Sequence, residues 1–113
     1  MTTDLKKLIQ IDEDLFEHCG VRVESISYVF NEDEIKIYAE ICSVGGHNIN
    51  SDLIVVVAFY TDNGIEHTID CYIRKDSFYK CKILRESNYF DDSKYLNSLK
   101  SRISKVCAFI EKN

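Results

Sequence analysis

The sequence predicts a mainly β protein, a single antiparallel β-sandwich domain. Residues 53–60 form a continuous run of β-forming residues, which indicates a strand that is buried on both faces. Residues 35–44 and 65–74 alternate between apolar and polar side chains, as strands do when only one face meets the core. Asn63-Gly64 separates two of these segments and is a strong hairpin signal, because both residues tolerate positive φ.

The size and composition fit one globular domain. The chain has 113 residues, and we expect residues 1–19 to form an N-terminal extension that packs on a sandwich of residues 20–112. Fourteen basic and nineteen acidic residues give a net charge of −5 without a basic cluster, so neither nucleic acid nor membrane is expected as a partner. Because the sequence shows neither a secretory signal nor about 18 consecutive apolar residues, we expect a cytoplasmic protein.

The N-terminal segments carry mixed signals. Residues 4–11 suggest one or two helical turns, although residues 9–11 also alternate as a strand would. In the acidic segment that follows, Leu15 and Phe16 are expected to pack inward. Residues 21–30 form a predicted strand whose apolar positions change parity midway, which predicts a bulge near Glu24-Ser25.

The C-terminal third contains one predicted strand, at residues 78–84, and one ambiguous region. A helical stripe begins at residue 96 and continues to residue 110, and Asp92 is placed to cap such a helix. The pattern therefore favours a helix over residues 93–101. It leaves residues 103–111 open, because alternate residues there are also apolar as in a strand.

The order of strands and turns resembles the small immunoglobulin-like β-sandwiches of the FxLYD type. The segments that carry the resemblance are residues 35–44, 48–52, 55–64 and 102–112. The segment that names the family falls on residues 57–61, where Tyr60 is identical, Phe59 is conservative, and Val57 and Thr61 differ. The residue pattern gives the expected short helical segments near the N-terminus and around residues 92–101. The resemblance covers roughly residues 20–112 and implies an immunoglobulin-like sandwich. It also implies a final strand over residues 103–111, and it supplies no catalytic residues.

The cysteines are expected to be free, reduced and metal-free. Their number is odd, and no two have Cys-x-x-Cys spacing; they are Cys19, Cys42, Cys71, Cys81 and Cys107. His67 and Cys71 share a strand face, but about 13 Å of strand separates them, so they cannot hold one ion unaided. Cys42 and His47 flank a loop and can approach each other. No cysteine follows a glycine-rich turn or begins a clear helix, as an activated nucleophile would.

The tyrosines give the main functional hypothesis. Tyr38 and Tyr72 fall on the polar faces of their strands, which we expect to form one face of a sheet, and Tyr79 lies in an aromatic-rich stretch. Because exposed aromatic residues on a sheet often mark a binding face, we expect a non-enzymatic interaction or accessory module, with a protein partner or a second copy. No catalytic, cofactor-binding or metal-binding residue is predicted. The alternatives are a ligand-binding or enzymatic domain with a cleft around residues 45–51, walled by His47, and a thiol-based redox or metal sensor.

Overall fold

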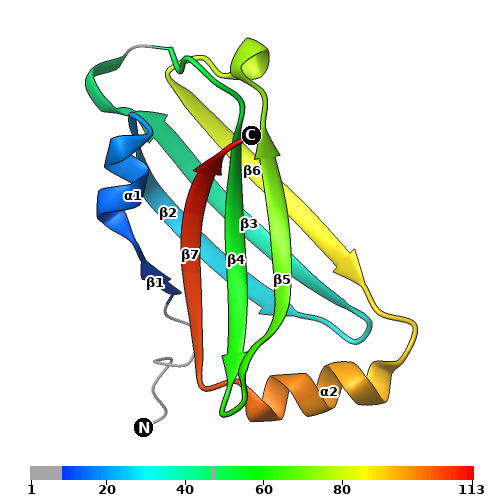
Figure 1. Cartoon of the computed structure of the whole chain (residues 1–113). Coiled ribbons are helices and arrows are strands. Elements are labelled where there is room, and N and C mark those ends of the chain that lie inside the picture. The colour runs from blue at the N-terminus through cyan, green and yellow to red at the C-terminus, as the bar shows by residue number, and fades with distance from the viewer. Residues whose placement is uncertain (1–8, 47) are drawn as a thin grey trace, which may run out of the picture.

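The computed structural model describes residues 9–46 and 48–113, in which seven strands form two sheets that pack face to face (Figure 1). In order across it, one sheet contains β1 (Ile9–Ile11), β7 (Lys105–Lys112), β4 (Leu53–Thr61) and β5 (Gly64–Ile73). The other contains β2 (Val21–Phe30), β3 (Glu34–Ser43) and β6 (Cys81–Tyr89). The helices are α1 (Glu13–His18) and α2 (Ser93–Arg102), and short 3-10 turns are η2 (Val44–Gly46) and η3 (Lys75–Ser77). The predicted mainly β sandwich is confirmed.

The core lies between the two sheets and follows the alternation of the strands. On β3, Ile35, Ile37 and Ile41 are fully buried, and on β4 the same holds for Val55 and Phe59. These side chains are separated by two or four residues along each strand, so those of one strand all leave the same face of their sheet. The apolar face that the sequence predicts for residues 35–44 is therefore the face that meets the opposite sheet.

The local turn and bulge signals are confirmed. β4 and β5 form an antiparallel hairpin that closes at the pair Thr61 and Gly64, with Gly64 at a φ of 104°. The register of β2 against β3 shifts between Val23 and Ser25, which is the predicted bulge. These features depend on neighbours in sequence, and this is why a pattern can predict them.

The N-terminal region differs from expectation in three ways. Residues 9–11 form β1 rather than a helical turn, and residues 4–8 of that prediction lie outside the described residues. β1 pairs in parallel with β7, so one strand pair departs from the expected antiparallel sandwich. Phe16 is buried as predicted, but Leu15 is 39% exposed, because α1 presents one narrow face to β2 and β7.

Helix α2 and strand β7 resolve the C-terminal ambiguity. The Asp92 side chain accepts hydrogen bonds from the backbone N–H groups of Lys94 and Tyr95, at 2.9 and 3.3 Å, and so starts the helix. Leu96 and Leu99 turn its apolar face to the core, and α2 lies across one end of the two sheets (Figure 1). The chain then becomes extended, so the predicted helix at residues 93–101 and a final strand are confirmed, although the strand begins at Lys105 rather than at residue 103.

Strand β6 begins later than the sequence predicts. Residues 78–80 precede it, and it continues to Tyr89 instead of ending at residue 84. Lys80 has a φ of 62°, a left-handed conformation that interrupts the extended chain.

Among the described residues, no helix is long and apolar enough to cross a membrane.

Candidate functional site: the outer face of the β2–β3–β6 sheet

The outer face of the β2–β3–β6 sheet follows from strand alternation. Ile35, Ile37 and Ile41 point into the core, so the residues between them point away from it. The register with β2 and β6 then identifies their outward neighbours. We call this surface the β2–β3–β6 face; it consists of Arg22, Ser25, Ser27, Val29, Glu34, Lys36, Tyr38, Glu40, Cys42, Cys81, Ile83, Arg85, Ser87 and Tyr89.

Large apolar side chains are exposed on all three strands of this face. Val29 is 43% exposed, Tyr38 39%, Ile83 63% and Tyr89 73%. They share the face with small serines, so little covers them. Exposed apolar side chains gathered on one face of a sheet typically mark an interaction surface.

Charged side chains surround the central tyrosine of the face. Lys36 and Glu40 each lie two residues from Tyr38 on β3, about 7 Å away along the strand in opposite directions. Arg85 is the residue on β6 that pairs with Tyr38. The Lys36 ammonium is 3.7 Å from a carboxylate oxygen of Glu34, at the long end of the range for an ion pair. Glu40, Lys36 and Arg85 are therefore the charged residues next to Tyr38 on the face, and Glu34 lies one outward position beyond Lys36.

A disulfide lies at one end of the same face. Cys42 on β3 and Cys81 on β6 are directly paired residues, and their sulfurs are bonded. The expectation of five free cysteines is therefore wrong for these two. It fails because the register of two strands that are distant in sequence brings them together. The carboxylate of Glu40, one outward position along β3, has an oxygen within 4.8 Å of both sulfurs.

The predicted interface tyrosines do not share one face. Tyr38 lies on the β2–β3–β6 face, whereas Tyr72 lies on β5 and points outward from the opposite sheet, so the expectation of a common face is wrong. Both are at least partly exposed, as predicted. Tyr79 precedes β6 and is 74% exposed, with the Lys80 ammonium 5.7 Å from its ring centroid. Tyr79 is therefore near the disulfide end of the face but outside its strands.

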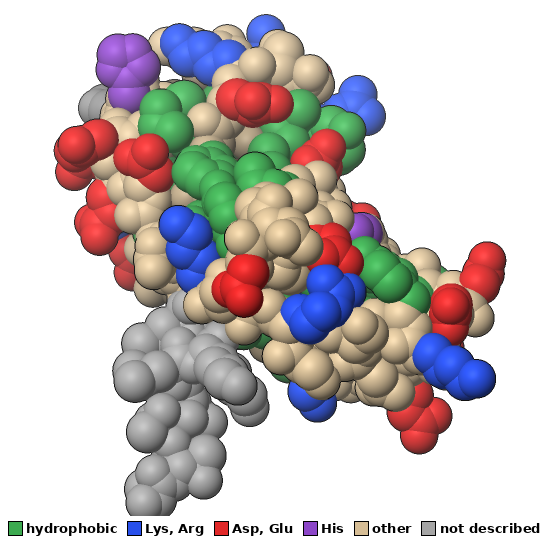
Figure 2. Space-filling view, turned by 60° about the horizontal axis from the view of Figure 1, so that its bottom comes forward, with side chains coloured by type: hydrophobic (Ala, Val, Ile, Leu, Met, Phe, Trp, Pro, Cys, Tyr) green, Lys and Arg blue, Asp and Glu red, His purple; other side chains and the backbone are tan. Residues whose placement is uncertain are grey.

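The outer face of the opposite sheet is also apolar but is less available. Hydrophobic side chains run along the middle of it, with charged side chains around them (Figure 2). Ile54 and Ala58, on the central strand β4, are already buried by their neighbours, while exposed apolar groups such as Ile65 and Tyr72 lie on the edge strand β5. The β2–β3–β6 face therefore offers more exposed apolar surface across its full width.

The predicted cleft at the loop end is a small hollow. It has a volume of about 170 Å³, and its lining residues are His18, Cys19, Gly20, Asn48, Ile49, Asn50, Ser51, Leu53 and Lys112. His47, the predicted wall, lies outside the described residues. Pockets for small molecules usually measure about 300–1,000 Å³, so this hollow suits little more than solvent. A larger depression of about 590 Å³ lies between the β2–β3 turn and α2, but its lining is mostly polar and it is open to solvent.

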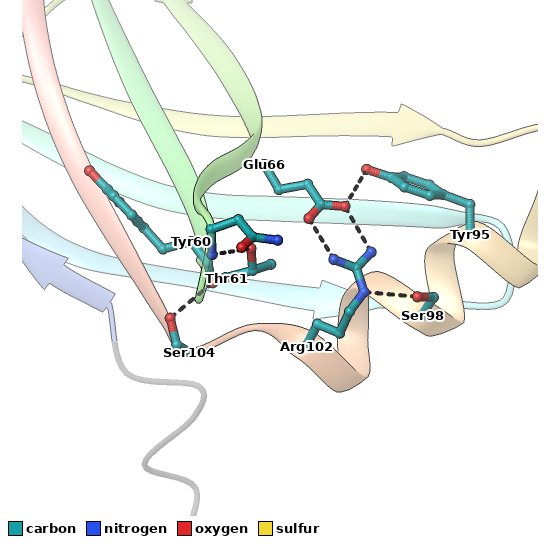
Figure 3. Close-up of polar contacts among 8 residues, drawn as sticks. Tyr60, Thr61, Glu66, Tyr95, Ser98, Arg102 and Ser104 are labelled. Carbon is teal, nitrogen blue, oxygen red and sulfur yellow. Dashed lines mark hydrogen bonds and ion pairs between the residues drawn. The ribbon is translucent and has the colours of Figure 1, made fainter.

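The strongest pKa shift of a carboxyl group has a structural cause. Glu66 of β5 accepts hydrogen bonds from Arg102 and Tyr95 of α2, and Arg102 also donates to Ser98 at 2.9 Å (Figure 3). The hydrogen bond from Arg102 is the main reason that the pKa of Glu66 falls from 4.5 to about 2. These contacts hold α2 against β5, so the role of Glu66 is structural.

The histidine and cysteine that share a face of β5 do not form a reactive pair. The His67 ring packs 5.0 Å from the ring of Phe90, and its Nε2 atom is 3.3 Å from the amide oxygen of Asn88. Cys71 is buried, and this burial raises the pKa of its thiol to about 12. Both side chains face the core, so they serve packing.

Comparisons of the chain with protein-family models, with curated proteins and with solved structures found no match, and the site is therefore assigned from its own geometry.

Proposed function

We propose that this chain is a non-enzymatic interaction module that binds a second copy of itself through the β2–β3–β6 face. The observation that carries the proposal is the exposure of four large apolar side chains from three neighbouring strands on one face that no other described element covers. The four are Val29, Tyr38, Ile83 and Tyr89. Tyrosine is favoured at the centre of interfaces, because it adds a large apolar area with a polar end.

The charges around Tyr38 support a second copy as the partner. In a contact with two-fold symmetry the same patch meets itself, so it must be complementary to its own rotated image. Lys36 and Glu40 lie at equal distances on either side of Tyr38. When two β3 strands cross antiparallel at Tyr38, Lys36 of each copy meets Glu40 of the other. The same axis brings Arg85 of one copy towards Arg85 of the other, so two attractive contacts stand against one repulsive contact.

A second packing geometry gives the same kind of complementarity. Sheets pack face to face either nearly aligned or close to perpendicular. Two perpendicular arrangements place Tyr38 on Tyr38. In one of them Arg85, beside Tyr38 on β6, moves over Glu40 of the second copy, and in the other it moves over Lys36, which costs free energy. Glu40 therefore meets a basic residue in the antiparallel geometry and in the first perpendicular one. A parallel alignment would instead place Lys36 over Lys36, which costs free energy.

Self-association is tested first by removing the apolar centre. Sedimentation equilibrium should show wild-type dimers, and the double change Tyr38→Ser with Ile83→Ser should weaken the dimer by about 2 kcal/mol or more, roughly thirtyfold in Kd. Ile65→Ser with Tyr72→Ser is the matched control on the opposite sheet and should leave the dimer intact. A wild-type chain that is still monomeric at about 1 mM, where even a 4 kcal/mol interaction would be half-formed, overturns the proposal.

Charge exchange tests the partner and the geometry together. Glu40→Lys alone should dissociate the dimer, because it places like charges opposite each other. Mixing it with Lys36→Glu should give a mixed dimer if the β3 strands are aligned, since both contacts then become attractive. Mixing it with Arg85→Glu should do so if the sheets are perpendicular. If neither mixture associates, the two-fold arrangement at Tyr38 is wrong.

We also propose that the sandwich is of the immunoglobulin-like kind. Its support is the strand order: two hairpins, β2–β3 and β4–β5, are followed by β6 beside β3 and β7 beside β4. In immunoglobulin-like domains the second strand pairs with the fifth, and the third with the sixth. When β2 is counted as the first strand, these pairs correspond to β3 with β6 and β4 with β7. The usual last strand has no counterpart here, and β1 occupies the position beside β7 in parallel orientation. An experimental structure with a different strand order would contradict this assignment.

A further inference from the structure

We infer that the reduced protein binds a divalent metal ion of the zinc class between Cys42, Cys81 and Glu40. This inference does not rest on self-association, although it shares Glu40 with the proposed dimer contact, and it contradicts the metal-free state that the sequence predicts. It stands on the β3–β6 register, which places the two cysteines directly opposite each other on the outer face. Glu40 points to the same side from the next outward position on β3.

The spacing of the three side chains suits one ion. Their ligand atoms all lie within 4.8 Å of one another. A tetrahedral zinc ion, with bonds of about 2.3 Å to sulfur and about 2.0–2.2 Å to oxygen, needs its ligand atoms about 3.5–3.8 Å apart. Because the two strands already hold the cysteine backbones side by side, side-chain rotation after reduction is enough to reach this spacing. Three protein ligands leave a fourth position for water.

The chemistry of the ligands selects the metal. Two thiolates with one carboxylate favour zinc over magnesium and calcium, which take oxygen ligands only. Arg22, the β2 neighbour of Cys42, does not oppose a cation strongly, because its guanidinium is 2.6 Å from the carboxylate of Glu24. Cys42 is buried, whereas Cys81 is exposed and gives the ion a way in from solvent.

The redox state controls the site, because disulfide sulfurs are not thiolates. A phosphine reductant supplies two electrons that break the bond, and two protons from water leave a thiol on Cys42 and on Cys81. The phosphine takes up the water oxygen and becomes a phosphine oxide. On zinc binding, each thiol loses its proton to solvent, so two protons are released for each ion that enters.

The test is a zinc titration of the metal-free chain, with and without a phosphine reductant, against a chromophoric zinc chelator. The reduced protein should bind one equivalent, and the oxidised protein none. Cobalt as a second probe should give the sulfur-to-cobalt absorption of a thiolate site. Glu40→Gln should weaken zinc binding about tenfold or more, and Cys42→Ser or Cys81→Ser should weaken it further. Cys19→Ser is the control and should bind as the wild type does.

Three results would overturn the inference. They are less than one equivalent of zinc in the reduced wild type, equal binding by the oxidised protein, and unchanged affinity after Glu40→Gln or after loss of either cysteine. Circular dichroism of each variant shows that it is folded, and Glu40→Gln, a surface change, remains informative if a cysteine variant is not. The titration is repeated in the Tyr38→Ser background, so that the outcome does not depend on whether the chain self-associates.

Discussion

Glu66 of β5 and Arg102 of α2 form a two-pronged ion pair, with Nη1 of Arg102 2.5 Å from Oε1 of Glu66 and Nη2 2.7 Å from Oε2. The hydroxyl of Tyr95, two turns earlier in the helix, donates to the same carboxylate at 3.1 Å. Two residues of α2, Arg102 and Tyr95, therefore bind the carboxylate of Glu66 on β5 (Figure 3). Because α2 connects β6 of one sheet to β7 of the other, this contact holds the helix across the end of the sandwich.

The ion pair predicts how stability depends on acid pH. The Arg102 hydrogen bond lowers the pKa of Glu66 from 4.5 to about 2, so the unfolded chain takes up this proton at a higher pH than the folded chain does. The stabilisation is fully present above about pH 5 and is lost as the pH falls towards about 2. Urea unfolding should therefore show a steeper loss of stability over this interval for the wild type than for Glu66→Gln. Equal slopes would mean that solvent screens the pair.

Leu99 should be among the most costly residues to truncate. It is fully buried and lies on the face of α2 that packs against the core. Leu99→Ala should lower the free energy of unfolding by about 2–5 kcal/mol, because it leaves a cavity as well as losing apolar burial. Lys100→Ala, the neighbouring exposed position, is the control and should stay within about 0.5 kcal/mol of the wild type. If Leu99→Ala lost as little stability in urea unfolding as Lys100→Ala, Leu99 would lie outside the core.

The disulfide should make stability depend on reductant. It closes a loop with a sequence separation of 39 residues, and such a link typically stabilises a fold by about 2–4 kcal/mol, chiefly by restricting the unfolded chain. Wild-type protein should therefore unfold at lower urea concentration when reduced. The Cys42→Ser, Cys81→Ser double variant should unfold at the same urea concentration with and without reductant. A reductant effect of equal size in that variant would assign the sensitivity elsewhere.

The parts of the fold that were predicted from sequence are those with local signals. The alternation of residues 35–44 identifies a strand and its core face, and Asn63-Gly64 identifies a hairpin, because both depend on residues that are close in sequence. The start of α2 is also local, since the Asp92 side chain caps the first turn. These predictions needed no knowledge of which strand pairs with which.

The candidate site depends on strand pairing, and this is where prediction stopped. The outward positions of Tyr38 and Tyr72 were predictable from their own strands, but their separation onto opposite sheets was not. Likewise, nothing near Cys42 in the sequence points to Cys81, because the β3–β6 register alone makes them neighbours. The alternation of residues 35–44 places Cys42 on the outward side of its strand, but in residues 78–84 Cys81 falls on the same side as the apolar Ile83. The sequence therefore indicated neither the direction of the Cys81 thiol nor its partner.

The last prediction concerns how many thiols react, and it separates the disulfide from the remaining cysteines. In the native protein, iodoacetamide should label Cys19 first, because it is partly exposed, while Cys71 stays unlabelled because it is buried and its thiol pKa is raised to about 12. Unfolding without reductant should expose three thiols, those of Cys19, Cys71 and Cys107. Unfolding with reductant should expose all five.

Cys19→Ser is the control for this labelling experiment, and it should abolish the early label while lowering both later counts by one. Five labels without reductant would show that Cys42 and Cys81 are not bonded in solution, and rapid labelling of Cys71 would show that the core around β5 opens readily.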